Sequence, residues 1–382
     1  MQAELNSLKN IVIGFDPIAS TVRVFRVNSS LNDAVCNDIK VDKNLFLRGE
    51  YGEALRNALS YYVKNIADIP SAFIVLPNSL VASDYVELPK MNKKKILESL
   101  RAEIVKLYAN SMNLNVLTAQ VDDKGEENAL FFVTMGNMLF INDVSTGLAK
   151  VSVQPRAFTY SAPCSLNALL ETRSNLRNKT FLFADVRAAS TILTVCSNST
   201  IRCYLDLPFG FNVLRTDIIY PENSLIDNGD AEETVDAAVV KASGGKKAKT
   251  YDKANYLEDY TLNESEREKK KLEFYDSLIP EGLKTKVTGE ELDVLYANFA
   301  LFEKNIDLFV ESNSNSSYIP KIESVIINLP EEFYCLKDFV AESGKKIPYE
   351  FLDNKNKNRA YVLNFDLYGA TLIRKFNTEQ VF

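Results

Sequence analysis

The amino-acid sequence predicts an α/β fold built from two related domains, each with a mixed sheet flanked by helices. Three observations support this prediction. A unit of strand, acidic turn and strand occurs twice, about a domain length apart. Helical and strand patterns alternate between the two copies and after the second one. The length of 382 residues is also what two domains of ordinary size require.

The strand-turn-strand unit occurs near the N-terminus and again in the middle of the chain. Its β-rich runs cover 10–16 and 21–27 in the first copy, and 180–185 and 190–195 in the second. The turns begin at Asp16 and Asp185, and their sequences differ by one inserted residue. A repeat at this spacing indicates a duplicated domain, because solenoid repeats recur about every 20 to 50 residues. Two unrelated hairpins with a chance similarity are the alternative.

Between the two copies the pattern alternates between helix and strand. Residues 92–108 place apolar side chains on one face of an amphipathic helix, and three lysines begin its opposite face. β-Rich runs predict strands over 72–76, 116–121 and 130–133. These elements predict a mixed sheet with helices in the first domain.

The second half contains a change in composition. Residues 221–271 are rich in Asn, Asp, Glu, Lys and Ser, so we expect a partly flexible insertion there. A capping box at Thr288 predicts a helix that ends in the Ser/Asn cluster 312–317. The remaining expected elements are a strand over 324–329, a helix over 331–343, an extended segment over 347–352, a strand near 361–363 and a helix near 367–375.

The composition excludes several classes of function. Lys and Arg number 44 against 51 Asp and Glu, a net charge of −7, so the chain has no general positive field that would attract nucleic acid. The sequence contains no His. This removes Ser-His-Asp and Cys-His catalysis, the zinc protease helix motif and any His general base.

Cysteine usage and hydropathy predict a cytoplasmic protein. The cysteines are spread along the chain without a Cys-x-x-Cys pair: Cys36, Cys164, Cys196, Cys203 and Cys335. We expect free thiols, and a disulfide between Cys196 and Cys203 is the alternative. No signal peptide or membrane span is expected, because polar residues and Gly interrupt the longest apolar stretch, 129–141.

Two strand-turn-strand units with an acid at each turn are the frame of the actin, sugar kinase and heat-shock ATPase fold, an actin-like (ribonuclease H-like) duplicated two-domain fold. Within it, the sequence resembles the family of the cytoplasmic type IV pilus assembly protein PilM, a relative of the cell division protein FtsA. The order and spacing of short segments carry this resemblance, and nearly the whole chain is covered apart from 221–283. The segments are 13–16, 20–24, 86–91, 146–148, 183–185, 205–210 and 368–374.

The resemblance also implies the domain limits. The first actin-like domain is expected over 1–179, with 84–151 as an inserted subdomain. The second is expected over 180–382, with 221–318 as a partly flexible inserted subdomain.

The sequence departs from the family at the turns that contact nucleotide. Ile18 stands where the family has a Gly in the first turn, Arg187 replaces the Gly of the second turn, and 329–331 replace the paired glycines after the late strand. Glycine allows backbone N–H groups to approach a phosphate, and proline has no N–H. We therefore expect a degenerate nucleotide site near Asp16, Ile18, Ser20, Asp185, Arg187, Leu329 and Pro330, and no bound ATP or Mg²⁺.

Two alternatives keep a nucleotide in this site. Arg187 could pair with a phosphate, but it would need the rest of the cradle. Asp16 and Asp185 could hold Mg²⁺, which prefers carboxylate oxygen and water. With the glycines gone, we expect both aspartates to cap their turns by accepting hydrogen bonds from backbone N–H groups.

The predicted function is that of a non-catalytic cytoplasmic scaffold in a type IV pilus-like or secretion-like assembly machine. The resemblance implies that it binds the cytoplasmic tail of a single-span inner-membrane pilus assembly protein, in a groove of the first domain, and reaches the membrane through that partner. The alternatives are an active actin-like ATPase or filament former and an FtsA-like cell division tether. Against the tether, 376–382 lack a basic amphipathic helix.

Overall fold

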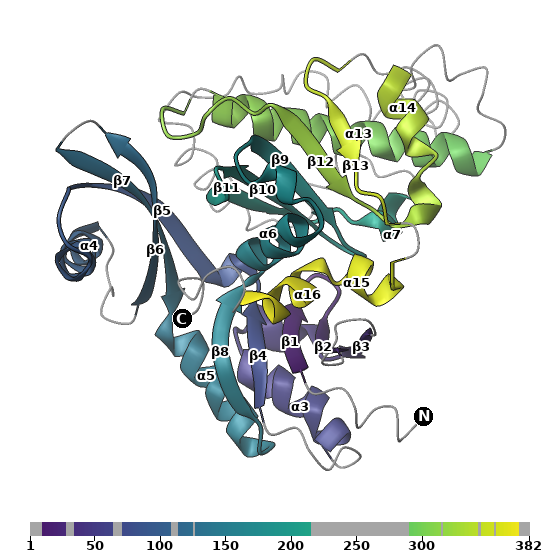
Figure 1. Ribbon diagram of the computed structural model, residues 1–382. Coiled ribbons are helices and arrows are strands. Elements are labelled where there is room, and N and C mark those ends of the chain that lie inside the picture. Colours follow the sequence, from purple (N-terminus) through teal and green to yellow (C-terminus); the bar gives the residue numbers. More distant parts are fainter. Residues whose placement is uncertain are drawn as a thin grey trace, which may run out of the picture.

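The computed structural model describes residues 10–27, 34–63, 71–107, 114–124, 127–214, 290–314, 316–342, 345–354 and 357–373. Two five-stranded sheets and one three-stranded sheet form the frame of this part of the chain (Figure 1). The predicted insertion over 221–271 and the capping box at Thr288 lie outside the described residues. No helix among the described residues is both long and apolar enough to cross a membrane.

The first five-stranded sheet has the strand order β3-β2-β1-β4-β8. Its strands are β1 (Asn10–Asp16), β2 (Thr21–Val27), β3 (Ala34–Lys40), β4 (Ser71–Leu76) and β8 (Gln154–Tyr160). The first three strands form an antiparallel meander, and β4 and β8 continue the sheet in parallel. Its helices are α2 (Lys43–Leu47), α3 (Tyr51–Val63), α5 (Met138–Lys150) and α6 (Ser161–Thr172), with a 3₁₀ turn, η3, at Ser174–Leu176.

The second five-stranded sheet repeats this topology in the order β11-β10-β9-β12-β13. Its strands are β9 (Thr180–Val186), β10 (Thr191–Ser197), β11 (Thr200–Leu207), β12 (Ser324–Asn328) and β13 (Tyr349–Phe351). Again an antiparallel meander is followed by two parallel strands. The strand-turn-strand repeat is thus confirmed as a duplication. The accompanying helices are α7 (Phe211–Leu214), α13 (Glu290–Ser314) and α14 (Leu336–Glu342).

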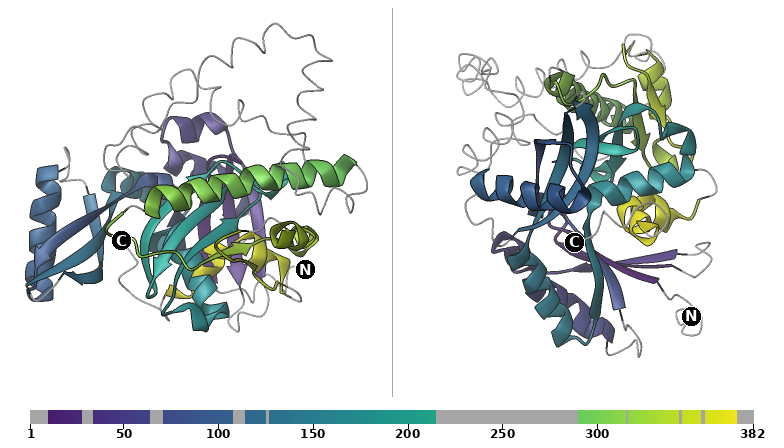
Figure 2. Two further views of the ribbon diagram at one scale, coloured as in Figure 1. Left: turned by 90° about the horizontal axis from the view of Figure 1, so that it is seen from above. Right: turned by 60° about the vertical axis from the view of Figure 1, so that its left-hand side comes forward.

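The three-stranded sheet projects from the rest of the molecule, as Figure 2 shows in two further views. It consists of β5 (Val81–Pro89), β6 (Leu114–Lys124) and β7 (Asn128–Asn137), preceded by the 3₁₀ turn η1 (Asn78–Leu80). The amphipathic helix α4 (Lys93–Leu107) buries Leu100 and Ile104 against this sheet. The predicted helix and the strands predicted over 116–121 and 130–133 are confirmed here, as is the strand over 72–76, which is β4 of the first sheet; β5 was not predicted.

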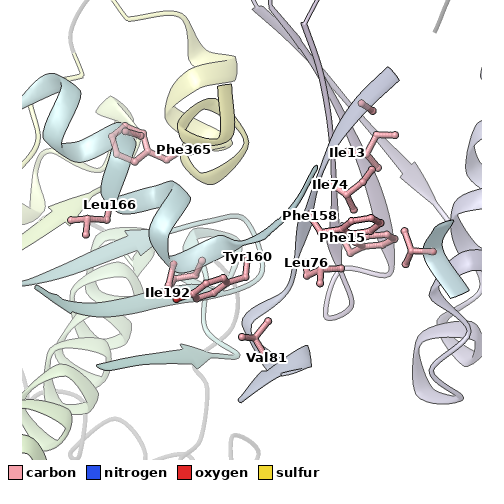
Figure 3. Packing of buried hydrophobic residues seen from close by; sticks show 14 of the residues in the cluster. Ile13, Phe15, Ile74, Leu76, Val81, Phe158, Tyr160, Leu166, Ile192 and Phe365 are labelled. Carbon is pink, nitrogen blue, oxygen red and sulfur yellow. The ribbon is translucent and has the colours of Figure 1, made fainter. Parts of the chain in front are cut away.

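Both faces of the first sheet are covered because its central strands are apolar on both sides. Ile13 and Phe15 of β1 pack toward α3 and α5 together with Ile74 and Leu76 of β4 (Figure 3). Val12, on the opposite face, packs with residues of α6 and of the C-terminal helix α16 (Phe365–Thr371). Continuous apolar runs are typical of strands that are buried on both faces.

Two C-terminal predictions are wrong. Residues 361–363, predicted as a strand from their β-branched and aromatic content, lie in helix α15 (Arg359–Leu363), because the Asn358 side chain caps its start by accepting a bond from the Ala360 N–H at 2.8 Å. The helix predicted over 331–343 is divided into a 3₁₀ turn, η5 (Glu331–Phe333), and α14. All five cysteines are free, which confirms the expected thiols.

Helices α6 and α16 lie side by side between the two five-stranded sheets (Figure 1). Glycine permits this close contact. A Cβ atom at Gly369 would lie 1.7 Å from the Cys164 carbonyl oxygen, and one at Gly14 would lie 2.5 Å from Leu367 Cδ2. The position of α16 over β1 therefore depends on two residues without side chains.

We predict that Gly369→Ala lowers the free energy of unfolding by about 3 kcal/mol, because the added methyl group meets backbone that cannot move without separating α16 from α6. Chemical denaturation of the variant and the wild type measures the difference. Thr371→Ala on the same helix is the control and should change stability by less than about 1 kcal/mol. Equal stability of Gly369→Ala and wild type would show that the contact is looser than described.

Candidate functional site

The turn between β1 and β2 is held by its own aspartate. The Oδ1 atom of Asp16 accepts a hydrogen bond from the Ala19 backbone N–H at 2.9 Å, which confirms the predicted role of this residue. Ile18 is 48% exposed in this turn. Ser20 closes the turn with a positive φ of 53°. A branched side chain thus occupies the turn position where a phosphate-binding loop presents bare backbone.

The turn between β9 and β10 is held differently. Asp185 is 1% exposed, and its Oδ1 accepts a hydrogen bond from the Asn328 side chain at 2.9 Å while its Oδ2 accepts one from the Ser165 hydroxyl at 2.7 Å. The expectation of backbone donors is therefore wrong for this residue. Strands β9 and β12 are parallel neighbours that place Asn328 opposite Asp185, and this register brings the amide to the carboxylate.

The residues that follow β12 are buried. Leu329 is fully buried, and its carbonyl oxygen accepts a hydrogen bond from the Asn354 side chain at 3.0 Å. Asn354 also donates to the Asn328 side chain at 2.9 Å. Pro330 is buried and precedes η5. The side chain of Leu329 is part of the core, and Pro330 has no N–H to donate to a ligand.

Arg187 binds an acidic side chain of the C-terminal helix. Its Nη2 atom lies 2.9 Å from Oδ2 of Asp366, and its Nε atom lies 3.6 Å from Oδ2 of Asp185. Arg23 of β2 also binds Asp366, with Nη1 at 3.1 Å from Oδ1 and Nη2 at 2.8 Å from Oδ2. Ser161 donates its hydroxyl to Asp366 Oδ2 at 3.2 Å. One buried carboxylate therefore joins an arginine of the first half to an arginine of the second.

The pKa values of the carboxylates in this network depend on burial and on the neighbouring arginines. Burial alone would raise the pKa of Asp366, but Arg187 and Arg23 lower it to about 2. Burial raises the pKa of Asp185, and Arg187 opposes that effect. Burial likewise raises the pKa of Asp206, on β11, against the effect of Arg187. Asp366 is the carboxylate that the two arginines keep ionised.

A second set of contacts between the halves lies along β11. Alternate residues of this strand reach the first half: Arg202 Nη2 donates to the Val121 carbonyl at 2.6 Å, the Tyr204 hydroxyl to the Val81 carbonyl at 2.9 Å, and Asp206 accepts from Asn78 at 2.6 Å. The hydroxyl of Tyr85 on β5 donates to the Arg202 carbonyl, and its ring stacks on Tyr318 at 4.9 Å. The three-stranded sheet is thus bonded to the second half.

The arrangement does not fit a nucleotide with its Mg²⁺. The branched Ile18 stands in the first turn, Arg187 is engaged by Asp366, both oxygens of Asp185 already accept hydrogen bonds, and Pro330 follows the late strand without an N–H. Among the described residues, no three His, Cys, Asp or Glu side chains are placed so that they could hold a metal ion.

The structure brings together some of the predicted site residues and adds others. Asp185 and Arg187 share one network with Asn328, which directly precedes Leu329 and Pro330. Asp16 and Ile18 belong to the turn of the first half. Sequence reasoning missed Arg23 and Asp366. Each is a charged residue within a largely apolar segment, Arg23 in a strand and Asp366 in the last helix, and this pattern could have indicated a buried ion pair.

No protein-family model matches the sequence, and no curated protein is significantly similar to it. Among solved structures, the chain is similar to one in the PilM-PilN type IV pilus biogenesis complex, with a TM-score of 0.52 and 12% identity over 96% of this chain and 97% of that one. This likeness agrees with the resemblance seen in the sequence, and the fold is actin-like.

Two further solved structures have lower TM-scores. The cytoplasmic domain of EpsL, an inner-membrane component of the type II secretion system of Vibrio cholerae, has a TM-score of 0.37 and 13% identity over 54% of this chain and 75% of that one. The ethanolamine utilization protein EutJ from Carboxydothermus hydrogenoformans has a TM-score of 0.40 and 9% identity over 95% and 89%. Neither score is high enough to support a conclusion about this chain.

The stabilisation that Asp366 provides should depend on pH. Because its pKa falls from 3.8 to about 2 on folding, its ionised form favours the folded protein above pH 4, and this contribution is lost as the pH falls through 2. We predict that Asp366→Asn destabilises the protein, and that the difference from wild type is smaller by about 1 kcal/mol at pH 3 than at pH 7. Urea unfolding at both pH values measures it. A difference that is equal at both values would contradict the assignment.

Proposed function

We propose that this protein is a non-catalytic cytoplasmic scaffold, a pseudo-ATPase, of a type IV pilus-like or secretion-like assembly machine. Its task is to bind the cytoplasmic tail of a single-span inner-membrane protein. The main support for a non-catalytic role is the ion pair between Arg187 and Asp366. Because Arg187 of the second turn already binds a carboxylate within the chain, it is not available to a phosphate.

Energetics supports the proposed absence of nucleotide binding, in addition to the lost glycines. A phosphate would have to displace Asp366 from Arg187, and the displaced carboxylate would remain buried with only one of its two arginine partners, Arg23. Breaking a buried ion pair in this way costs about 3 to 5 kcal/mol. Ile18 and Pro330 withhold the backbone contacts that could offset this cost.

The proposed partner is supported by the likeness to a chain of the PilM-PilN complex along nearly the whole length of both chains. A second support is an apolar surface on the first half. Leu47 and Leu139 are 72% and 62% exposed, at the end of α2 and the start of α5. Phe140 of α5 lies close to Gly49, two residues after α2, since a Cβ atom at Gly49 would lie 3.3 Å from the Phe140 ring. Exposed apolar side chains suit the anchor residues of an extended peptide.

The rival function is that of an actin-like protein that binds ATP and uses it for hydrolysis or polymerisation. The fold itself is compatible with this rival, because function depends on the site and not on the fold. An active protein would have to release Arg187 from Asp366 when nucleotide binds. The two functions therefore differ in a simple binding measurement.

We predict that millimolar MgATP or MgADP leaves the melting temperature unchanged. A ligand present at 100 times its dissociation constant stabilises by about 2.7 kcal/mol, which a thermal-shift assay detects readily. Magnesium chloride alone is the control. A saturable rise in melting temperature with MgATP would refute the pseudo-ATPase and establish the rival.

We predict that the full chain recovers a single-span protein with a short cytoplasmic tail from detergent-solubilised membranes of the source organism. The expected dissociation constant is about micromolar, or about −8 kcal/mol, because ordering an extended peptide offsets much of the contact energy. The double variant Leu47→Ser with Leu139→Ser should weaken binding at least about tenfold. Leu308→Ser, at a site that is 55% exposed on α13, is the matched control. Recovery of soluble enzymes only, or equal binding by both variants, would contradict the proposal.

A further inference from the structure

We infer that the Asp366 carboxylate is a built-in anion that holds the two halves of the protein together, and that its removal creates an oxyanion site between Arg23 and Arg187. The inference concerns how the halves are joined and does not depend on tail binding.

The donors around Asp366 come from three elements that are distant in the sequence. Arg23 of β2 binds both carboxylate oxygens, at 3.1 Å and 2.8 Å. Arg187 approaches Oδ2 from the β9–β10 turn at 2.9 Å, and Ser161 donates to the same oxygen from the start of α6 at 3.2 Å. Two guanidinium groups and a hydroxyl around one anion are a donor set that suits an oxyanion such as phosphate.

The network is closed to water. The side chain of Asp366 is 0% exposed, that of Arg23 is 5% and that of Arg187 is 7%. Without the carboxylate, two buried guanidinium groups would face one another with no anion between them. Such an arrangement is strongly unfavourable in a medium of low dielectric constant.

The position of Asp366 makes it a link between the halves. It is the second residue of α16, whose Gly369 and Leu367 pack closely on α6 and β1. Arg23 belongs to β2 of the first sheet, and Arg187 directly follows β9 of the second. The carboxylate is therefore held rigidly at the level where it can pair with both arginines, and no external ligand is needed to bring the halves together.

The test is to replace the carboxylate and supply an anion from solution. Asp366→Ala should lower the melting temperature by about 5 °C or more in sodium chloride. Inorganic phosphate or sulfate at the same ionic strength should raise it again in a saturable manner. Wild type should not respond, because Asp366 fills the site. Asp366→Asn is the matched control, since its amide keeps the volume and should be destabilised without rescue.

The inference is overturned if Asp366→Ala is as stable as wild type, or if phosphate raises the melting temperatures of wild type and variant equally. Should Asp366→Ala not fold, hydrogen exchange of Arg187→Met decides. This variant leaves Asp366 paired with Arg23 and should exchange at least about tenfold faster in 185–190 and 361–373, with other core segments unchanged. Unchanged exchange there refutes the link. A response of wild type to MgATP would instead refute the proposed function, so the two failures are distinguishable.

Discussion

The structure depends on one buried carboxylate between two arginines. Asp366 pairs with Arg23 of the first half and with Arg187 of the second, and all three side chains are nearly inaccessible to water. Buried charges of this kind are tolerated when each is paired with an opposite charge. The position of α16, the conformation of the second turn and the mutual position of the two sheets must therefore be compatible with this one arrangement.

Close helix packing places Asp366 within reach of the two arginines. Gly369 brings α16 onto α6, and Gly14 leaves room for Leu367 above β1. The apolar faces of both sheets turn toward these two helices, so the charges lie in a layer that hydrophobic burial has already excluded from water. We infer that these side chains keep the actin-like fold in one state, as the proposed scaffold function requires.

The duplicated α/β fold could be predicted from the sequence because its signals are local: apolar runs, an acid at each turn and a repeat of domain length. The loss of turn glycines at Ile18 and Arg187 was also visible. What Arg187 contacts could not be predicted, because Asp366 lies far along the chain and only the tertiary fold brings them together. Residues 361–363 were predicted wrongly for a related reason, since β propensity was outweighed by the Asn358 cap.

The most direct test of the central claim is the distance between the halves in solution, measured by double electron-electron resonance. One spin label can use the native exposed Cys335 of the second half, with Cys36 and Cys203 replaced by alanine, and the other an introduced cysteine at the exposed Thr146 of α5. The account predicts one narrow distance distribution that is identical without nucleotide, with MgATP and with pyrophosphate. A broad or bimodal distribution that narrows or shifts when MgATP is added would contradict it.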